Sequence, residues 1–186
     1  RPTPRLMLHL MSQLPAPLSA GPVAGWRVDY QMRASTWDSG KGAQADGGRW
    51  NPEGFAAVYC SIDPATAILE VAVHKRFSVL DTVPHVLTSL EVLEAADIHV
   101  VQPNDIPNPG WLVPGAPSDG QQRFGMALLV KHAFILIPST VSARSWNLLF
   151  NPGVARNRYR LRQQEALAVD TRLHPPQDRP PQPLTT

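Results

Sequence analysis

Residues 46–54 carry the sequence DGGRWNPEG, the most informative segment in this chain of 186 residues. Its two adjacent glycines let the backbone approach a ligand closely, because neither has a Cβ atom. Arg49 follows with a planar guanidinium that suits phosphate groups, and Trp50 offers a face for stacking. A tight turn carrying a surface arginine would explain the same residues, so a phosphate site here needs support from the rest of the chain.

The neighbouring segments predict short strands and one well-defined helix. Residues 26–30 and 57–60 favour strands, and residues 35–48 between them are polar and glycine-rich, which predicts a long loop. Asp63 can cap a helix that runs from Pro64 to His74. An apolar stripe at helical spacing predicts its buried face, which consists of Ala65, Ile68, Leu69, Ala72 and Val73.

The second half of the chain continues this mixed pattern. Residues 84–101 predict one or two strands, and the four prolines of residues 104–119 predict an irregular crossing. Beyond it we expect a helix from Ser118 or Asp119 to about His132, a strand over residues 134–137, and two final strands over residues 158–162 and 166–172. Helices and strands do not alternate regularly, so we predict an α+β domain built on antiparallel sheets.

Composition narrows the class of protein. A hydrophobic content of 43% fits a globular chain, and a net charge of +2 is too small to argue for nucleic-acid binding by itself. No apolar stretch is long enough to span a membrane. The single cysteine, Cys60, can form neither a disulfide framework nor a cysteine-based zinc site, and no histidines stand at metal-ligand spacing. We expect a reduced, cytoplasmic protein without a metal.

Both ends of the chain differ from the centre. Residues 1–20 form an N-terminal extension with a faint likeness to a secretion signal, which His9 and the flanking prolines weaken. Residues 175–186 contain five prolines and predict a disordered tail. One domain is therefore expected over residues 21–174.

Several polar residues have ordinary explanations when each is taken alone. A glutamate such as Glu70, on the flank of an amphipathic helix, is usually solvated. Ser139 follows a proline and could cap a turn, while Tyr59 in a short strand is more often a core residue. Arg27 is harder to explain, because an arginine within an apolar strand needs a partner or a ligand.

Considered together, the motifs form a specific series. They are WRV at 26–28, SGKGA at 39–43, GGRWNP at 47–52, VYCS at 58–61, ATAILEVAVH at 65–74, PS at 138–139, NLLFNP at 147–152 and DTRL at 170–173. This series resembles the RES domain over roughly residues 24–173. One departure is that Gly125 is followed by MAL at 126–128, where many members have an acidic residue or a tryptophan.

The resemblance implies a split antiparallel β-sandwich with flanking helices, like that of ADP-ribosylating toxins, that grips NAD+ as its substrate. It also implies a toxin of a bacterial toxin–antitoxin pair, which cleaves the nicotinamide–ribose bond. The implied catalytic residues are Glu70, Arg27 and Ser139, the serine of the family name. The implied NAD+-binding residues are Arg27 and Arg49 at the pyrophosphate or ribose, Gly48 beside them, Tyr59 packed on nicotinamide or its ribose, and Asn151 as a support.

These residue types suit the implied reaction. Breaking the nicotinamide–ribose bond builds positive charge on the ribose, which a nearby carboxylate stabilises. Nicotinamide is already a cationic leaving group, so one carboxylate can suffice. The acceptor stays open between water, phosphate and a protein side chain. Ile68 stands two residues before Glu70, where protein-modifying relatives of the broader fold often have Glu or Gln, and this favours a small acceptor over mono-ADP-ribosylation of a protein.

Two further expectations concern partners. An antitoxin, implied by the resemblance and resembling Xre-type DNA-binding proteins, would occlude the active site. A competing hypothesis is a nucleic-acid-binding module, because alternating arginines would make one strand face basic and Tyr159 could stack on a base. These arginines are Arg156, Arg158, Arg160 and Arg162. A charged edge strand that resists aggregation explains them as well, so we expect no direct contact with nucleic acid and none with a membrane.

Overall fold

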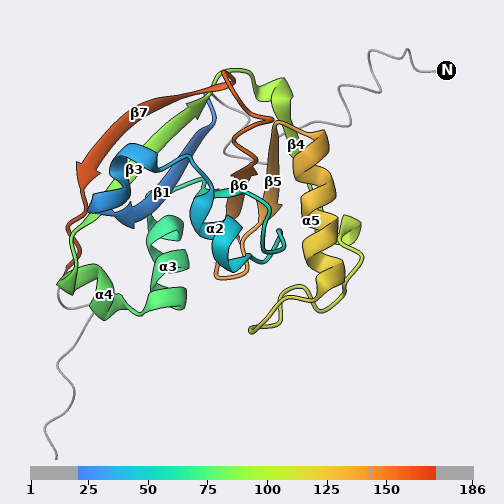
Figure 1. Ribbon diagram of the computed structural model, residues 1–186, viewed down its shortest axis with the longest axis horizontal. Coiled ribbons are helices and arrows are strands. Elements are labelled where there is room, and N and C mark those ends of the chain that lie inside the picture. The colour runs from blue at the N-terminus through green and yellow to red at the C-terminus, as the bar shows by residue number, and fades with distance from the viewer. Residues whose placement is uncertain (1–20, 143, 171–186) are drawn as a thin grey trace, which may run out of the picture.

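The computed structural model describes residues 21–142 and 144–170, which form a seven-stranded sheet flanked by helices (Figure 1). The expected extension over residues 1–20 and tail over residues 175–186 lie outside the described residues. The strand order is β4-β5-β6-β2-β1-β3-β7. The strands are β1 (Ala24–Tyr30), β2 (Val58–Ser61), β3 (His85–Val92), β4 (Ile98–Val100), β5 (Phe134–Pro138), β6 (Trp146–Phe150) and β7 (Tyr159–Ala166).

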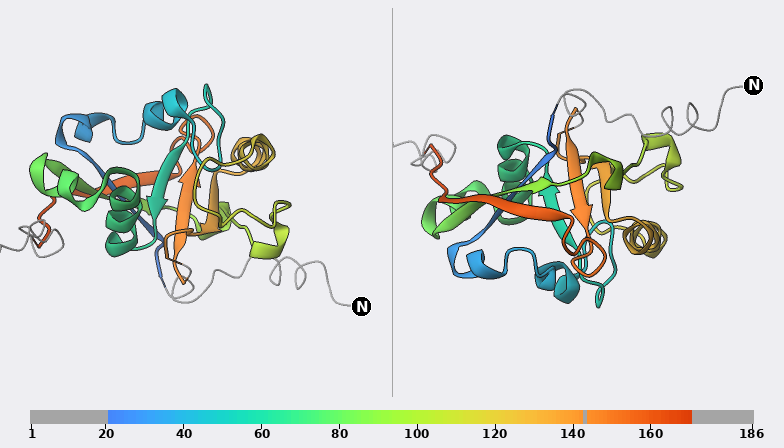
Figure 2. Two further views of the ribbon diagram at one scale, coloured as in Figure 1. Left: turned by 90° about the horizontal axis from the view of Figure 1, so that it is seen from below. Right: turned by 90° about the horizontal axis from the view of Figure 1, so that it is seen from above.

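The sheet is divided at its centre. Strands β1 and β2 meet at a single register position, Trp26 opposite Ser61, whereas β1 pairs with β3 along its whole length. One half is therefore β4-β5-β6-β2 and the other is β1-β3-β7, and Figure 2 shows them fanning apart. All pairs are antiparallel except β4 with β5. The expected α+β fold with a split antiparallel sheet is confirmed.

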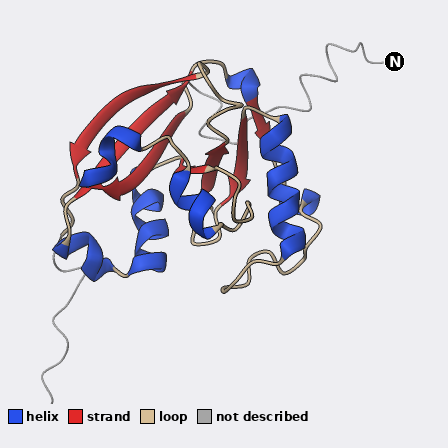
Figure 3. Cartoon of the chain, in the orientation of Figure 1, coloured by secondary structure: helices blue, strands red, loops and turns tan. Residues whose placement is uncertain are grey.

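Helices lie against both halves of the sheet (Figure 3), and the described residues form three apolar clusters. Helices α3 (Pro64–Lys75) and α4 (Phe77–Thr82) enclose an apolar cluster with β1 and β3, and α5 (Asp119–Lys131) encloses another with β5 and β6. A third cluster fills the opposite face of the sheet, around Cys60, Leu148 and Phe134. The predicted caps are confirmed, since Asp63 accepts from Thr66 N at 2.8 Å and Ser118 from Gln121 N at 3.2 Å.

The buried face predicted for α3 is correct for Ala72 and Ile68 and wrong for Leu69 and Val73. Leu69 and Val73 are 39% and 65% exposed, whereas Thr66, Ala67 and Ala72 face the sheet. Small residues allow the helix to lie close to β1, and the hydroxyl of Thr66 is satisfied there by Asp63 and Ser145. Tertiary packing therefore rotates the helix away from the orientation that its apolar stripe predicts.

Two other element predictions also need correction. The loop expected over residues 35–48 contains the end of the 3-10 helix η2 (Gln31–Thr36) and the short helix α2 (Lys41–Asp46). Of the two strands expected at the C-terminal end, the first belongs to β7, which continues to Ala166, and residues 167–170 are not a strand. Leu167 packs with the cluster under α3, and residues 171–172 lie outside the described residues. The remaining elements are the 3-10 helices η3 (Ala95–Asp97) and η4 (Pro103–Asp105).

Within the described ranges, no helix has the length and apolarity to cross a membrane.

Candidate active site

Glu70 is held through one oxygen of its carboxylate. Ser139, after the end of β5, donates its hydroxyl hydrogen to Glu70 Oε1 at 3.0 Å. Asn147 on β6 donates from Nδ2 to the same oxygen at 2.6 Å. The other oxygen, Oε2, receives no hydrogen bond from residues 21–142 or 144–170. Two neighbouring strands thus fix the carboxylate of α3 and leave one oxygen for a ligand.

Ser139 is arranged to orient Glu70 rather than to attack a substrate. Its side chain is fully buried, and its Oγ accepts from the backbone N–H groups of Val141 and Ser142 at 3.2 and 3.1 Å. These two bonds occupy the lone pairs of the hydroxyl, so its hydrogen points to Glu70. The structure therefore brings these two candidate site residues together, with the serine as the hydrogen-bond donor.

Asn147 is a site residue whose role the sequence alone does not indicate. It stands in the NLLFNP motif, and Ser61 donates to its Oδ1 at 2.9 Å. The available signal was a polar amide in an apolar strand, which needs a partner once it is partly buried. Pairing of β2 with β6, which places Asn147 opposite Ser61, supplies that partner.

Tyr59 connects the site to the segment over residues 46–54. Its hydroxyl donates to Asn51 Oδ1 at 2.6 Å and accepts from Trp50 N at 3.0 Å. Burial raises the pKa of Tyr59 above its usual value. The charge of Arg49 lowers this pKa and the charge of Glu70 raises it, because both charged groups are near enough to act on the Tyr59 hydroxyl. A Cβ at Gly48 would lie 2.5 Å from the Tyr59 hydroxyl, which explains the second glycine of the motif by packing.

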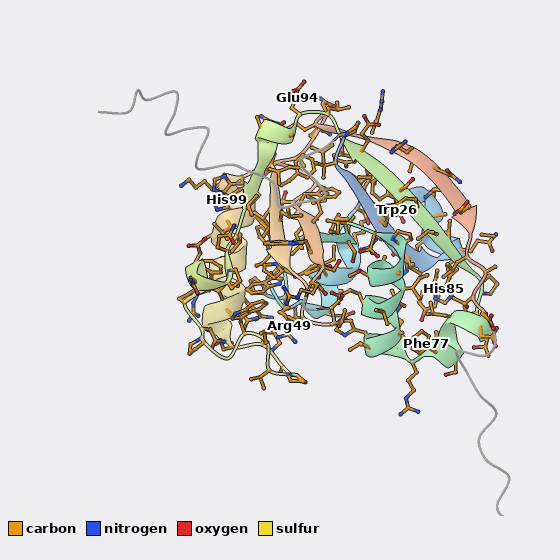
Figure 4. All side chains as sticks on the ribbon, turned by 180° about the vertical axis from the view of Figure 1, so that it is seen from behind. Trp26, Arg49, Phe77, His85, Glu94 and His99 are labelled. Atoms are coloured by element: carbon orange, nitrogen blue, oxygen red, sulfur yellow. The ribbon has the colours of Figure 1, made fainter. Side chains whose placement is uncertain are left out.

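Arg49 lies between α3 and α5 (Figure 4). Its Nη1 donates to the carbonyl oxygens of Trp111 at 2.9 Å and Val113 at 3.4 Å. Nε and Nη2 have no partner in the described part of the chain, so they remain available to an anion. Gln122 of α5 anchors the same segment by donating to Gly48 O at 2.9 Å.

Arg27 has its charge already compensated. It forms a bidentate pair with Asp29, at 2.6 and 2.7 Å, and its Nη1 donates to the backbone oxygen of Tyr59 at 2.9 Å. A cavity of about 430 Å³ adjoins it, with Arg33, Lys41 and Asp46 also in its wall. Burial raises the pKa of Cys60 to about 12, an effect that Arg27 opposes and Asp29 reinforces. Arg27 thus lies on the Cys60 side of β2, whereas Glu70 lies on the Asn147 side.

Asn151 directly follows β6, at the opposite end of the strand from Asn147. Its Nδ2 donates to Ala56 O at 3.0 Å, and its Oδ1 accepts from Gly153 N at 2.9 Å. These contacts hold the turn after β6 against the segment before β2. The structure brings Glu70, Ser139, Tyr59 and Arg49 to one side of the sheet, and it leaves Asn151 in a structural contact.

The face proposed for nucleic acid is largely neutralised. Arg158 pairs with Asp97, and both Arg160 and Arg162 lie within 4 Å of Glu91. Tyr159 donates its hydroxyl to Asp38 at 2.8 Å and packs its ring on Phe150. Of the side chains that were expected to bind phosphates and a base, Arg158, Tyr159, Arg160 and Arg162 are therefore engaged within the protein.

Known proteins resemble this chain in sequence and in fold. The family model of the RES domain matches residues 24–174. A Toxin Res of Yersinia enterocolitica is 35% identical over 125 residues, covering 64% of this chain and 76% of that protein. A Prs ADP-ribosylating toxin of a Sphingobium species is 36% identical over 141 residues, covering 68% and 81%. The crystal structure of the M. tuberculosis MbcT-MbcA toxin-antitoxin complex contains a chain with a TM-score of 0.57 and 22% identity, covering 79% of this chain and 85% of that one.

Proposed function

This chain belongs to the RES domain family, and we propose that it is the toxin of a toxin–antitoxin pair that cleaves the nicotinamide–ribose bond of NAD+. In this reaction the bond between C1′ of the ribose and the nicotinamide nitrogen breaks, and its electron pair leaves with nicotinamide. An acceptor oxygen then bonds to C1′. The relatives described as Toxin Res and as an ADP-ribosylating toxin support this class of chemistry.

The observation that carries the proposal is the geometry of Glu70. Ser139 and Asn147 hold Oε1, so Oε2 can face the ribose as positive charge develops there. A carboxylate that is already oriented needs no rearrangement when the charge appears.

Arg49 is the better placed of the two arginines for the pyrophosphate. Two of its nitrogens lack partners among the described residues, and a guanidinium binds phosphate oxygens through paired N–H groups. Arg27 is compensated by Asp29 and bound to the Tyr59 carbonyl. We therefore assign Arg27 to the support of Tyr59.

A small acceptor fits the surroundings of Glu70 better than a protein side chain does. Ile68 packs against the apolar cluster beneath α3 and offers no polar group to a protein acceptor. We propose water or phosphate as the acceptor. Mono-ADP-ribosylation of a protein is the second candidate, which the name of the Sphingobium relative favours.

Incubation of the purified protein with NAD+ tests the proposal. We expect free nicotinamide together with ADP-ribose in phosphate-free buffer, or with a phosphorylated ADP-ribose when phosphate is the acceptor. Chromatography with mass detection separates these products. Label from adenine-labelled NAD+ that accumulates on protein would favour mono-ADP-ribosylation, and no loss of NAD+ would contradict both candidates.

The antitoxin is proposed to bind over the same site. Arg49 offers an acidic group of the partner the N–H donors that a pyrophosphate would use. The solved relative in a toxin-antitoxin complex supports a protein partner of this kind, which we expect to be Xre-like. Partner affinity for the protein should fall as NAD+ is raised, when it is measured with a Glu70→Gln variant that cannot consume the ligand. An unchanged affinity would place the partner elsewhere.

A further inference from the structure

We infer that Ser61 is a positioning residue that acts on Glu70 through Asn147. The inference rests on the proposed function, because it concerns the same carboxylate. Ser61 is 2% exposed, and its Oγ donates to Asn147 Oδ1 at 2.9 Å, while Asn147 Nδ2 donates to Glu70 Oε1 at 2.6 Å. Three residues on β2, β6 and α3 thus form one directed chain of hydrogen bonds.

The direction of this chain follows from the donors and acceptors available. A carboxylate only accepts hydrogen bonds when ionised, so Asn147 must present its NH2 group to Glu70 and its carbonyl oxygen to Ser61. An inverted amide would place two acceptor oxygens against each other at Glu70. The hydroxyl of Ser61 favours the productive orientation because it gives Oδ1 a buried donor that would otherwise be missing.

The position of Ser61 links this chain to the division of the sheet. Ser61 is the residue of β2 that pairs with Trp26, at the single register position where the two halves meet. It is also directly opposite Asn147 in the β2–β6 pair. Backbone pairing on both sides fixes its Cα, so its side chain can hold Asn147 with little freedom. Two hydrogen bonds, from Ser61 to Asn147 and from Asn147 to Glu70, therefore connect the junction of the two halves to the reacting carboxylate.

The two oxygens of the Glu70 carboxylate have different roles, because among the described residues Oε1 is held by the protein and Oε2 is not. Ser139 and Asn147 both bind Oε1, and Ser61 fixes the second of these donors. Oε2 is then the oxygen directed to the ribose. Because Ser61 touches neither Glu70 nor the ligand, its loss should affect the transition state and leave the ground-state binding of NAD+ nearly unchanged.

The test compares Ser61→Thr with Ser61→Val, which have similar volumes and differ in the hydroxyl. The turnover number for NAD+ should stay near the wild-type value in Ser61→Thr. It should fall about tenfold in Ser61→Val, which corresponds to an activation barrier raised by ~1.4 kcal/mol. KM should change by less than about twofold in both variants. Ser89→Ala is the matched control. Ser89 is a buried serine of β3 that also pairs with Trp26, and it should keep the wild-type turnover number.

A double-mutant cycle identifies the route of the effect. In an Asn147→Ala background, Ser61→Val should cause no further loss, since the residue through which Ser61 acts is gone. The same tenfold loss in both backgrounds would contradict the inference and would place the effect in the sheet junction. Equal turnover numbers for Ser61→Thr and Ser61→Val would contradict it as well.

A spectroscopic measurement separates this inference from the proposed function. The side-chain amide of Asn147 should give two resolved 15N-coupled NMR signals in the wild type and in Ser61→Thr, with slow exchange of its protons, and should lose this protection in Ser61→Val. That outcome supports the positioning role even if the wild-type protein fails to consume NAD+, which would refute only the proposed function. An unprotected Asn147 amide in the wild type would refute the positioning role.

Discussion

The two arginines of the site illustrate why residue type alone does not settle a role. Arg27 and Arg49 both fit phosphate groups, but Asp29 compensates Arg27, while Arg49 keeps two nitrogens without partners among the described residues. The order of motifs pointed to Glu70 and Ser139, which a hydrogen bond joins in the structure. It could not reveal Asn147 or Asp29, because their importance depends on which side chains the folded strands bring opposite them.

Replacement of the arginines should therefore have unequal effects. Arg49→Ala should weaken NAD+ binding roughly tenfold or more, as expected when a charge-assisted bidentate contact is lost. Arg49→Lys should recover little of it, because an ammonium cannot reproduce the planar fork. Calorimetry in a Glu70→Gln background measures both affinities. Arg123→Ala, at an exposed position on α5, is the control, and unchanged affinity in Arg49→Ala would refute the role of Arg49 as the phosphate ligand.

At the scale of elements, the helix ends were predictable because their caps are local. Asp63 and Ser118 each bond a backbone N–H three residues ahead, and such contacts depend only on sequence neighbours. The buried face of α3 and the single final strand were not predictable, since they depend on distant packing. The hydroxyl of Thr66, which faces the sheet, is satisfied by the neighbouring Asp63 and also by Ser145, 79 positions away.

The cap of α3 makes a prediction about pH. Burial alone would raise the pKa of Asp63, but hydrogen bonds from Thr66 and Ser145 outweigh it and lower the pKa below its usual value. Ionised Asp63 therefore stabilises the fold above its unfolded pKa of about 3.9, and this stability is lost as pH falls through the lower folded value. Urea unfolding of the wild type and Asp63→Asn should show a constant gap from neutral pH to about pH 5 and a shrinking gap at lower pH. A gap that persists at the lowest pH would contradict the effect.

The contact between α5 and the GGRWNP segment makes a second prediction for an element. A Cβ at Gly125 would collide with the backbone oxygen and Cβ of Trp50. Gly125→Ala should therefore lower the free energy of unfolding by about 1–3 kcal/mol, despite the better helix propensity of alanine. Gly120→Ala in the same helix meets only Ser118 Oγ, at 3.9 Å, and should be neutral or slightly stabilising. Equal stability of both variants in urea would mean that α5 does not pack closely on Trp50.

At the scale of the whole molecule, the divided sheet positions the site. The half formed by β4, β5, β6 and β2 carries Ser139, Asn147 and Tyr59, and α3 crosses from the end of β2 to the other half while it presents Glu70. The residue pattern predicted the mixed class, and the resemblance to the RES domain implied the split. It could not predict that the halves join at one pair of residues, since that pairing is visible only once the strands are assembled.

The central claim is that the free oxygen of Glu70 drives the cleavage of NAD+. The most direct measurement is the rate of nicotinamide release by the wild type and by Glu70→Gln, which keeps the shape of the side chain but removes its charge. Glu53→Gln, an exposed position on the GGRWNP side of the protein, serves as the control for a lost surface charge. We predict a fall of at least ~10²-fold for Glu70→Gln at an unchanged melting temperature, and wild-type release for Glu53→Gln. Release by folded Glu70→Gln at the wild-type rate would contradict the account.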